Sequence, residues 1–446
     1  MVVRRFAILL VGLAVGWWLF VDTYGRYATP SLEAHTIRFG HFGTYQDYEL
    51  WRAVIAEFQR VHPDIRVQQE YIVGLAGQYN TKMRQQILSH TLPDVALVQL
   101  GPFHELAGHF ADLSAFLEDS VGGDPPLATS LDGVGLSAFQ FAGRQRGLPI
   151  SGGNLLIYGN VECFERAGRF HGQPVPLPDH EWTVEDFRRM ADLLTCDFDG
   201  DGTVDQFGFW LPRWIYYLPF IWSFGAELTD DTLTQWKLVG AEAEQAFTFY
   251  RNLAIGDHAC PRADEVPQLF QDVGFLTGKV ALCVNGPWFQ VFLAKTRLAG
   301  SYFVAPIPRG KAGRATRITW DGVVMAKDLP PKRRDLSCHF IRFLLSKPVQ
   351  DHIARTGRAL PARCESSTVF VDPPGNTRRL RFVEALSYSR LQPLWPRFGE
   401  IDRVINRHLA HLLDPRRELS AAAMLEQLAH DPVIVAAFPD FKAMSP

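Results

Sequence analysis

The sequence predicts an α/β protein that begins with a doubly wound, mostly parallel sheet. Three observations support this class. The length of 446 residues is enough for roughly two or three domains. Segments of strand periodicity alternate with segments of helical periodicity after residue 34. The composition, 47% hydrophobic and 21% charged, is that of an ordinary globular chain.

The elements follow one another in a strand–helix–strand–helix–strand order. Residues 35–42 alternate apolar and polar side chains, which predicts a strand. Residues 46–64 place their apolar side chains on one helical stripe and end at His-Pro. Residues 65–72 alternate again, a helical stretch follows around Met83, and residues 93–100 are typical of a buried strand. This order predicts a parallel sheet, because parallel strands need long crossover connections.

The loops after these predicted strands are the first candidates for a ligand site. In a doubly wound sheet, ligands bind beyond the carboxyl ends of the strands. The corresponding loops are residues 41–46, 72–77 and 99–104. The first and third loops carry Tyr45 and Phe103, which are aromatic residues unusual in plain connections.

The N-terminal segment predicts export across a membrane. Two arginines precede an uncharged, apolar run over residues 6–21. This run makes about 24 Å of helix, less than the ~30 Å hydrocarbon core, which favours a cleaved signal peptide. Trp17 and Trp18 would instead suit a membrane anchor that is retained in the inner membrane. Residues 1–34 are therefore expected to be a signal peptide or an N-terminal anchor, and both possibilities place the body of the protein in the periplasm or cell envelope.

Charge and motifs argue against several functional classes. The net charge of -3 gives no overall attraction to nucleic acid. The six cysteines form no C-x-x-C pair, which argues against zinc ribbons and redox motifs, and we expect at most one disulfide. Residues 104–109 place two histidines about 140° apart on a helix, which does not fit a zinc protease. Residues 274–280 lack the spacing of a phosphate loop. The sequence therefore predicts a protein that is not an enzyme.

One segment carries a specific resemblance. Residues 270–288, FQDVGFLTGKVALCVNGPW, resemble the F-x-x-G-K-A-A-M-x-x-x-G-P-W segment of extracellular solute-binding protein family 1. This family contains the maltose-type and glycerol-3-phosphate-type receptors of ABC importers. Gly159 and Cys283 depart from the family pattern. Other stretches resemble family segments in the same order: residues 147–168, 181–187, 304–313, 338–350 and 356–363.

The resemblance implies a two-lobed periplasmic-binding-protein fold of type II. Such a fold has doubly wound sheets, a hinge of two or three chain crossings and a cleft between the lobes. The first lobe is expected to contain residues 35–147 and 316–345, and the second residues 148–315 and 346–446. The implied function is that of an extracytoplasmic receptor, which binds a sugar or oligosaccharide in the cleft and delivers it to ABC transporter permease subunits.

Candidate ligand-binding residues follow from sugar chemistry and from the resemblance. Proteins hold sugars by aromatic stacking and by carboxylates, amides and arginine. Trp288 ends the G-P-W motif, and the corresponding family tryptophan commonly faces ligand. Trp210, Trp214 and Tyr217 belong to an aromatic-rich segment for which a buried core helix is the competing interpretation. The remaining candidates lie at strand ends, near the crossovers or in the G-x-L-P turn: Tyr45, Glu70, Gln99, Ser151, Trp320, Asp321 and Arg358.

These candidate residues are compatible with two classes of ligand, a neutral sugar and a polyol phosphate. Abundant tryptophan and the lack of an Arg/Lys cluster in the cleft loops favour a neutral sugar over a polyol phosphate. A membrane-anchored sensory module is a second hypothesis, in which ligand occupancy is passed to a partner other than a permease. An enzyme acting on a glycan is less favoured, because no acid/base pair of carboxylates stands out.

Residues 197–208, DFDGDGTVDQFG, resemble a calcium-binding loop. The twelfth position holds Gly208 instead of the bidentate glutamate of an EF-hand, and the segment after it predicts a strand instead of a helix. We expect that the protein requires no cofactor. The loop is interpreted either as a structural calcium site or as an Asp/Gly turn without an ion, and the turn without an ion is favoured. The oxygen donors of a calcium site would come from Asp197, Asp199, Asp201, Thr203 and Asp205.

Overall fold

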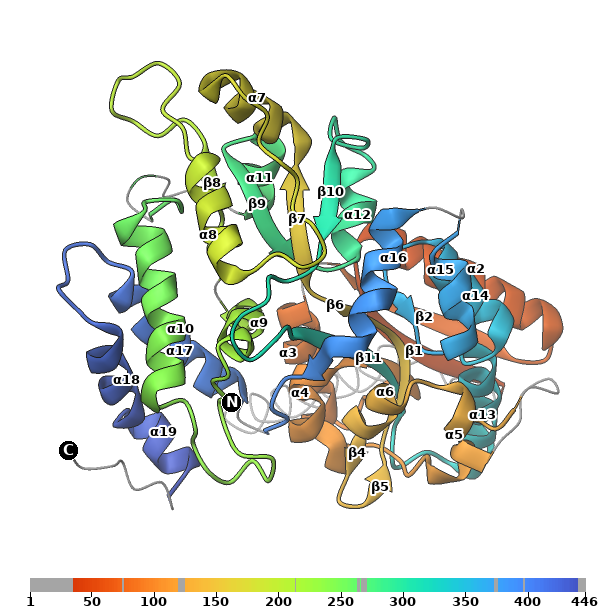
Figure 1. The fold of residues 1–446 in the computed structure, drawn as a ribbon. Coiled ribbons are helices and arrows are strands. Elements are labelled where there is room, and N and C mark those ends of the chain that lie inside the picture. Colours follow the sequence, from red (N-terminus) through yellow and green to blue (C-terminus); the bar gives the residue numbers. More distant parts are fainter. Residues whose placement is uncertain are drawn as a thin grey trace, which may run out of the picture.

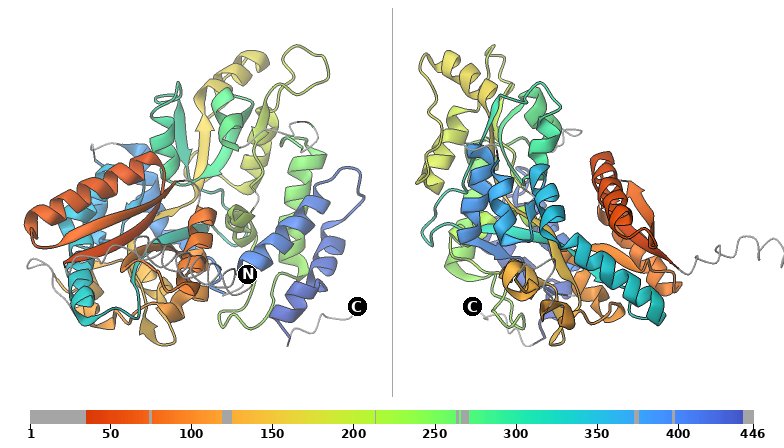
Figure 2. Two further views of the ribbon diagram at one scale, coloured as in Figure 1. Left: turned by 180° about the vertical axis from the view of Figure 1, so that it is seen from behind. Right: turned by 90° about the vertical axis from the view of Figure 1, so that its right-hand side faces the viewer.

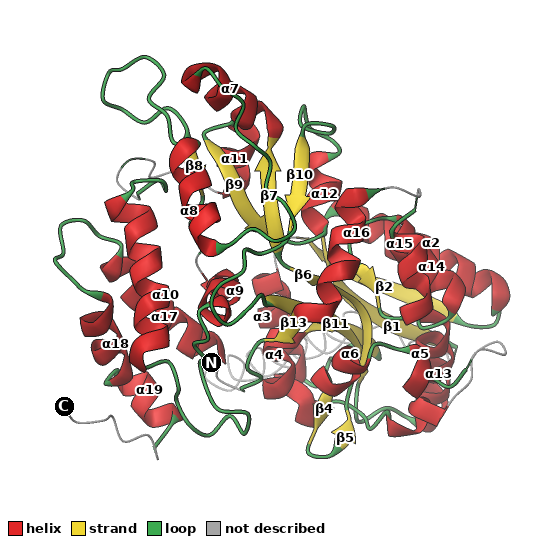
Figure 3. Ribbon diagram, in the orientation of Figure 1, coloured by secondary structure: helices red, strands yellow, loops and turns green. Residues whose placement is uncertain are grey.

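The described part of the chain builds two large sheets, each with its own helices and core, and one two-stranded sheet of β4 (Gln140–Phe141) and β5 (Arg144–Gln145) (Figure 1). The structure is a computed structural model, which describes residues 35–73, 76–118, 125–212, 214–262, 265, 271–372, 376–395 and 398–439. Figure 3 shows the two large groups of strands with the helices around them, and the β4–β5 hairpin apart from both. We call the half that contains the larger sheet the first lobe and the half that contains the smaller sheet the second lobe.

The first lobe begins as the sequence predicts. Its parallel strands are β1 (Thr36–Gly43), β2 (Arg66–Val73) and β3 (Val95–Gln99). Helices α2 (Tyr45–Val61) and α3 (Ala76–Leu88) connect them, and β1 pairs in parallel with both other strands. The predicted strand–helix–strand–helix–strand order is therefore confirmed.

Later segments complete the first sheet. They are β6 (Leu148–Asn154), β11 (Thr316–Met325), β12 (Leu360–Pro361) and β13 (Ser389–Leu391). The strand order is β12-β6-β11-β3-β1-β2, and β13 pairs with β11 off this path. Strand β11 runs antiparallel to β3 and to β6, so the sheet is mixed. Its helices are α4 (Leu100–Leu106), α5 (Leu127–Ser130), α6 (Gly133–Ala138), α13 (Pro331–Leu344) and α14 (Lys347–Arg355).

The second lobe contains a four-stranded sheet in the order β10-β7-β9-β8. The strands are β7 (Leu156–Asn160), β8 (Phe207–Phe209), β9 (Val280–Asn285) and β10 (Tyr302–Ala305). Its helices include α7 (Val161–His171), α8 (Val184–Leu193), α9 (Leu218–Ser223), α10 (Gly240–Arg251), α11 (Gln271–Thr277) and α12 (Trp288–Leu293). The C-terminal helices α17 (Phe398–Leu412), α18 (Ala421–Ala429) and α19 (Pro432–Ala437) lie beside α10 (Figures 1 and 2).

Three chain crossings join the lobes. Only Leu155 separates β6 in the first sheet from β7 in the second. Residues 306–315 lead from β10 back to β11, and residues 392–395 follow β13 on the side of α17. Polar contacts connect the crossings. The Thr316 hydroxyl donates to the Leu155 carbonyl, and the buried Arg317 donates through Nε and Nη2 to Gln392 Oε1 at 2.9 and 2.7 Å. The crossings therefore form one connected hinge region.

The strands place the lobe boundaries differently from the sequence-based expectation. The predicted first lobe ended at residue 147, whereas β6 pairs within the first sheet and the chain passes to the second sheet at Leu155. The predicted second lobe resumed at residue 346, whereas α14 buries Val349 and Ile353 in the first-lobe core. Strand β6 is buried along its whole length and α14 buries only one face, and neither pattern indicates the lobe against which the segment packs. Between the lobes lie α15 (Ser367–Phe370) and α16 (Thr377–Glu384), and α16 lies beside β10.

Two further observations concern the described residues. All six cysteines are free thiols: Cys163, Cys196, Cys260, Cys283, Cys338 and Cys364. None of the described helices is both long and apolar enough to cross a membrane. The predicted signal peptide or anchor, residues 1–34, lies outside the described residues.

Candidate functional site

Several predicted ligand residues meet at one edge of the first sheet. In the strand register, Asp321 of β11 lies opposite Gln99 at the end of β3 and opposite Ser151 of β6. The carboxyl ends of β1 and β3 lie at the same level, because Gly40 pairs with Ala96. Hydrogen-bonding side chains from three adjacent strands therefore lie side by side at the edge where parallel sheets bind ligands.

A small cavity opens at this edge between the start of α2 and the end of α14. Ser151, Asp321, Arg358, Asp47 and Thr356 supply its polar lining. Its volume is about 20 Å³, which suits one water molecule and is far too small for a sugar. The cavity is therefore a polar recess at the carboxyl edge of the first sheet, in which a single hydroxyl group could replace water. The apolar lining comes from Phe42, Leu50, Trp51, Leu97, Ile353 and Ala359.

Asp47 organises this recess, although the sequence analysis did not select it. Its side chain is 2% exposed, and its Oδ1 lies 2.7 Å from Nη1 of Arg358. Its Oδ2 accepts hydrogen bonds from the Thr44 backbone N–H at 2.6 Å and the Thr44 hydroxyl at 2.8 Å. The T-x-x-D pattern is a helix-start signal, so the sequence indicated the cap of α2 but not the bond to Arg358.

The Asp321 carboxyl has an unusual acidity. Burial raises its pKa to about 7, against the opposing effect of the Arg358 guanidinium, and the neighbouring carboxylate of Asp47 raises it further. Near neutral pH, a carboxyl group with this pKa is partly protonated, so it can donate a hydrogen bond as well as accept one. Such a group suits hydroxyls, which are both donors and acceptors.

Trp288 brings an aromatic ring from the second lobe to the same face of β6. It begins α12 directly after the Gly-Pro turn that follows β9, and it is half-buried. A Cβ atom on Gly153 would lie 2.9 Å from the Trp288 ring, so only glycine permits this close approach. Ser151 precedes Gly153 by two residues, so both point to the same face of the sheet, ~7 Å apart. The ring, the Ser151 hydroxyl and the Asp321 carboxyl therefore belong to one site.

Trp210 is a second half-buried tryptophan of the second lobe. It follows β8, and its backbone N–H donates to the Leu282 carbonyl at 2.9 Å. Trp210 and Trp288 both pack against the cluster around Tyr158, whose hydroxyl donates to the Gly286 carbonyl at 2.7 Å. That bond holds the turn from which Trp288 projects.

Two predicted ligand residues are buried in the cores instead. Trp320 is 1% exposed and packs against Gly135 and Gly152, because side chains alternate along β11 and Trp320 faces away from Asp321. Tyr217 is fully buried and donates to Asp402 Oδ1 at 3.0 Å. A ligand in the cleft cannot reach either ring in this conformation. The position of Tyr217 therefore agrees with the interpretation of the aromatic-rich segment as part of a buried core.

The remaining candidates take different positions. Glu70 forms an ion pair with Arg38 within the first lobe and accepts from Gln86 at 3.3 Å. Tyr45, in the first turn of α2, is 69% exposed. Trp214 begins a short 3-10 helix (Trp214–Tyr217), and its side chain lies outside the described part of the chain.

A larger groove of about 460 Å³ lies elsewhere, between α8 and α10 of the second lobe. Phe224 and Phe249 form part of its wall, and none of the predicted ligand residues lines it. We do not assign the ligand site to this groove on size alone, because the carboxyl ends of the first-sheet strands and the predicted ligand residues Ser151 and Asp321 lie at the smaller recess.

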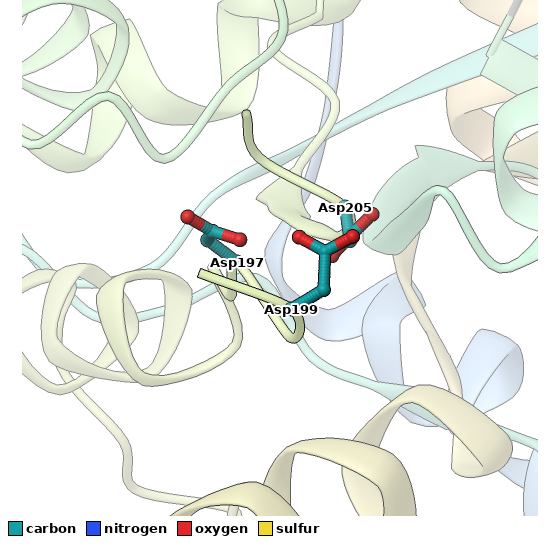
Figure 4. A group of neighbouring side chains, drawn as sticks. All are labelled: Asp197, Asp199 and Asp205. Atoms are coloured by element: carbon teal, nitrogen blue, oxygen red, sulfur yellow. The ribbon is translucent and has the colours of Figure 1, made fainter. Parts of the chain in front are cut away.

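The acidic loop forms a compact turn before β8 (Figure 4). Asp197, Asp199 and Asp205 have oxygen atoms that all lie within 4.8 Å of one another. Both oxygens of Asp197 accept backbone N–H groups at 2.8 Å, from Gly200 and Gly202, and these bonds lower its pKa. The three carboxylates suit a hard cation such as calcium, and the loop also closes through its own hydrogen bonds. The predicted strand after the loop is confirmed.

The other two predicted donors of the loop are arranged differently. The Asp201 carboxylate accepts from the Thr203 backbone N–H at 2.7 Å, and it does not belong to the group of converging carboxylates. Thr203 is exposed.

Sequence comparisons place the chain among binding proteins. The sequence model of the bacterial extracellular solute-binding protein family matches residues 43–351, which is more than half of the chain. A Brucella abortus protein that carries the name of a binding protein is 25% identical over 276 residues. That match covers 60% of this chain and 62% of the relative, so it spans less than two thirds of the relative's length.

Structural comparisons agree over nearly the whole chain. An ABC substrate-binding protein from Listeria monocytogenes in complex with cycloalternan has a TM-score of 0.78 at 21% identity, covering 91% of this chain and 99% of that chain. The GacH receptor of Streptomyces glaucescens, solved unliganded and with acarbose, has a TM-score of 0.74 at 20% identity, covering 91% and 99%. A solute-binding protein from Thermotoga lettingae bound with tagatose has a TM-score of 0.74 at 18% identity, covering 90% and 99%. These likenesses show the two-lobed fold.

Proposed function

The chain belongs to the bacterial extracellular solute-binding protein family, and from this premise we propose that it is an extracytoplasmic receptor for a neutral carbohydrate. The ligand lies in the cleft between the two lobes, and the loaded protein delivers it to the permease subunits of an ABC transporter. The structural neighbours described above support a sugar, because they were solved with cycloalternan, acarbose and tagatose.

The observation that carries the proposal is that three side chains lie beside the same face of β6: Trp288 of α12, Ser151 of β6 and Asp321 of β11. The Trp288 ring offers a flat apolar surface to the C–H face of a sugar. Ser151 and Asp321, in the recess beside it, offer hydrogen bonds to hydroxyl groups. An aromatic surface next to groups that both donate and accept matches the two kinds of surface that a sugar presents.

Ligand binding is coupled to closure of the lobes. Trp288 belongs to the second lobe, whereas Ser151 and Asp321 belong to the first. A ligand that contacts both lobes stabilises the closed form, because it makes more contacts there than in an open form. Among the described residues, the crossings at Leu155, at 306–315 and at 392–395 are the segments about which this motion takes place.

A titration series tests the proposal. Purified protein is titrated calorimetrically with neutral monosaccharides and oligosaccharides, and with glycerol 3-phosphate. We expect binding of at least one neutral sugar, and we expect Trp288→Ala to weaken it by about tenfold or more. Phe292→Ala, which truncates a 45% exposed ring of the same helix that stacks on Phe289, is the control and should bind as the parent does. Failure of every sugar to bind would refute the proposal.

Charge in the recess argues against a polyol-phosphate ligand. Arg358 is already paired with Asp47, and Asp321 adds a second carboxyl group. An incoming phosphate would meet no unpaired cation among these residues, although phosphate sites normally supply one. Binding of glycerol 3-phosphate without binding of any sugar would favour the polyol-phosphate ligand.

A sensory module and a glycan-cleaving enzyme would each use the occupied cleft in a different way. As a sensory module, the protein would keep residues 6–21 as a membrane anchor, which N-terminal sequencing of the native protein would reveal. A glycan-cleaving enzyme would need two carboxylates opposed across the sugar. Asp47 and Asp321 both belong to the first lobe, and both oxygens of Asp47 already have partners, so this arrangement favours binding over hydrolysis.

We also propose that the acidic loop holds a structural calcium ion. The convergence of the Asp197, Asp199 and Asp205 oxygens supports this proposal. The ion would fix the turn that leads into β8, and it would take no part in ligand chemistry in the cleft.

A further inference from the structure

Two histidines of the first lobe meet where α2 ends. His62 directly follows α2, and its backbone N–H donates to the Phe58 carbonyl at 2.8 Å. His339 belongs to α13, which packs against α2. The centres of the two imidazole rings are 5.8 Å apart, and the ring planes are inclined by 47°. We call His62 and His339 the histidine pair.

The histidine pair lies away from the proposed sugar site. Helix α2 begins after the carboxyl end of β1 and returns to the amino end of β2, as the connection between parallel strands requires. Its 17 residues span about 25 Å. Asp47, which organises the recess, lies in the first turn of α2, whereas His62 follows its last turn. The recess and the histidine pair are therefore at opposite ends of this helix.

The separation of the two rings suits two ligands of one metal ion. Zinc binds imidazole nitrogens at about 2.0–2.1 Å in tetrahedral geometry, which holds the centres of two ligand rings about 5 Å apart. The observed separation of 5.8 Å differs from this value by less than a small rotation of either side chain provides. The backbone therefore already places both rings at a distance that one ion can bridge.

Both rings are available to an ion. His339 is exposed and His62 is half-buried. Among the residues that the structure describes, no hydrogen bond or ion pair engages a ring nitrogen of either histidine. The Phe58 ring contacts the His62 ring at 4.7 Å and limits its movement. Burial, and then the neighbouring His339, lower the pKa of His62, so its ring is in the neutral form that binds metals near pH 7.

A carboxylate lies where a third ligand is needed. Asp335 precedes His339 by one turn of α13, so the two side chains share a face, and helical side chains lean toward the N-terminus. Asp335 is exposed, and no ion pair within the described ranges uses its carboxylate. Its oxygens do not converge with the two rings in the structure. A rotation about its side-chain bonds would bring the carboxylate to the ion.

A second pair of histidines provides a contrast. His408 and His411 lie on α17, with ring centres 6.2 Å apart. His408 is 9% exposed, and its Nε2 lies 3.2 Å from Oδ2 of Asp431. An ion between these rings would have to displace that carboxylate. Similar spacing with an engaged nitrogen makes this pair the matched control.

We propose that the histidine pair is a binding site for a divalent transition-metal ion, with zinc as the expected ion and Asp335 as a third ligand. Two imidazoles and a carboxylate suit zinc, whereas calcium prefers oxygen ligands alone and is expected only at the acidic loop. The ion joins the end of α2 to α13 and braces the first lobe. This inference does not depend on the identity of the sugar.

Calorimetric titration of the chelator-treated, tag-free protein with zinc chloride, in excess calcium to occupy the acidic loop, tests this inference. We expect zinc to bind the parent and to raise its melting temperature. His62→Ala and His339→Ala should each weaken zinc binding by about tenfold or more, and Asp335→Asn by less. Because His339 is exposed, its truncation should leave the melting temperature without zinc nearly unchanged. His411→Ala should bind zinc as the parent does.

The variants separate the histidine pair from other places where zinc could bind. A loss in both variants of the pair, with parental binding in His411→Ala, would support the site. Absence of zinc binding in the parent, or binding that survives both substitutions of the pair, would overturn it. An equal loss in His411→Ala or in Asp197→Asn would assign the ion to α17 or to the acidic loop and would also overturn it. Unchanged affinity in Asp335→Asn would overturn the carboxylate as a ligand.

Discussion

Breaking the ion pair between Asp47 and Arg358 tests how the first-lobe wall of the cleft is organised. The two groups lie 2.7 Å apart, and their side chains are 2% and 29% exposed. Two unit charges at this distance attract each other by about 6 kcal/mol at an effective dielectric constant of ~20. Because Arg358 still reaches water and both groups lose hydration, we expect a coupling free energy of about 1–2 kcal/mol. Asp47 also caps α2 through Thr44, which adds about 1 kcal/mol.

The expected result is a loss of about 2–3 kcal/mol in the free energy of unfolding for Asp47→Ala, the sum of the lost coupling and the lost cap. Arg358→Ala should cost less, because the Asp47 carboxylate keeps its bonds to Thr44. Denaturant unfolding of both single variants and the double variant gives the coupling free energy directly.

The pair formed by Arg84 and Glu105 serves as a matched control for this cycle. It also has a 2.7 Å contact, but its side chains are 42% and 41% exposed, so its coupling should stay below about 0.5 kcal/mol. If the Asp47–Arg358 coupling were no larger than the control, burial would not be what strengthens the pair, and the reasoning would fail.

Two further predictions concern pH and metal. Burial raises the pKa of Asp321 from 3.8 to about 7, so the folded protein keeps a proton that the unfolded chain releases. The contribution of Asp321 to the free energy of unfolding is therefore present below about pH 4 and is lost as the pH rises to about 7. Urea unfolding at about pH 5 and pH 8 should show this decline in the parent but not in Asp321→Asn. An equal decline in the variant would contradict the assignment. Removal of calcium by a chelator should lower the melting temperature of the parent by about 2–4 °C without changing its sugar affinity. The melting temperature of Asp197→Asn should not respond to the chelator. A parent melting curve that does not respond either would show that the turn needs no ion.

Local patterns predicted the first half of the fold because its signals are local. The alternation in residues 35–42 and 65–72 and the helical stripe between them predicted β1, α2 and β2. The prediction of these three elements required no knowledge of which segments meet in space. Ser151 and Asp321 became candidates in another way, because the family resemblance implied that each lies near a crossover between the lobes.

Residues whose side chains could face either a core or the ligand were harder to assign. Strand β11 is covered on both faces, so alternation shows that Trp320 and Asp321 face opposite sides but not which side is the cleft. The aromatic-rich segment could serve a core or a cleft, and Tyr217 joined the core. Asp47 was missed because its partner Arg358 is distant in the chain, and the pattern around Asp47 indicates only a helix start. These assignments depend on tertiary packing.

The length of the ligand and the closure of the lobes are physically connected in this arrangement. Trp288 stands on Gly153, two residues from the Leu155 crossing, so a sugar stacked there lies close to the hinge. Tyr45, at the start of α2, follows β1, which lies three strands from β6 in the first sheet, and a given rotation about the hinge displaces surfaces farther from it by a larger distance. A short ligand bound at Trp288 therefore gains few added contacts when the lobes close, whereas a ligand that extends to Tyr45 gains contacts along the whole cleft. Since a ligand shifts an equilibrium only by its difference in affinity for the two states, longer oligosaccharides should favour the closed form more strongly.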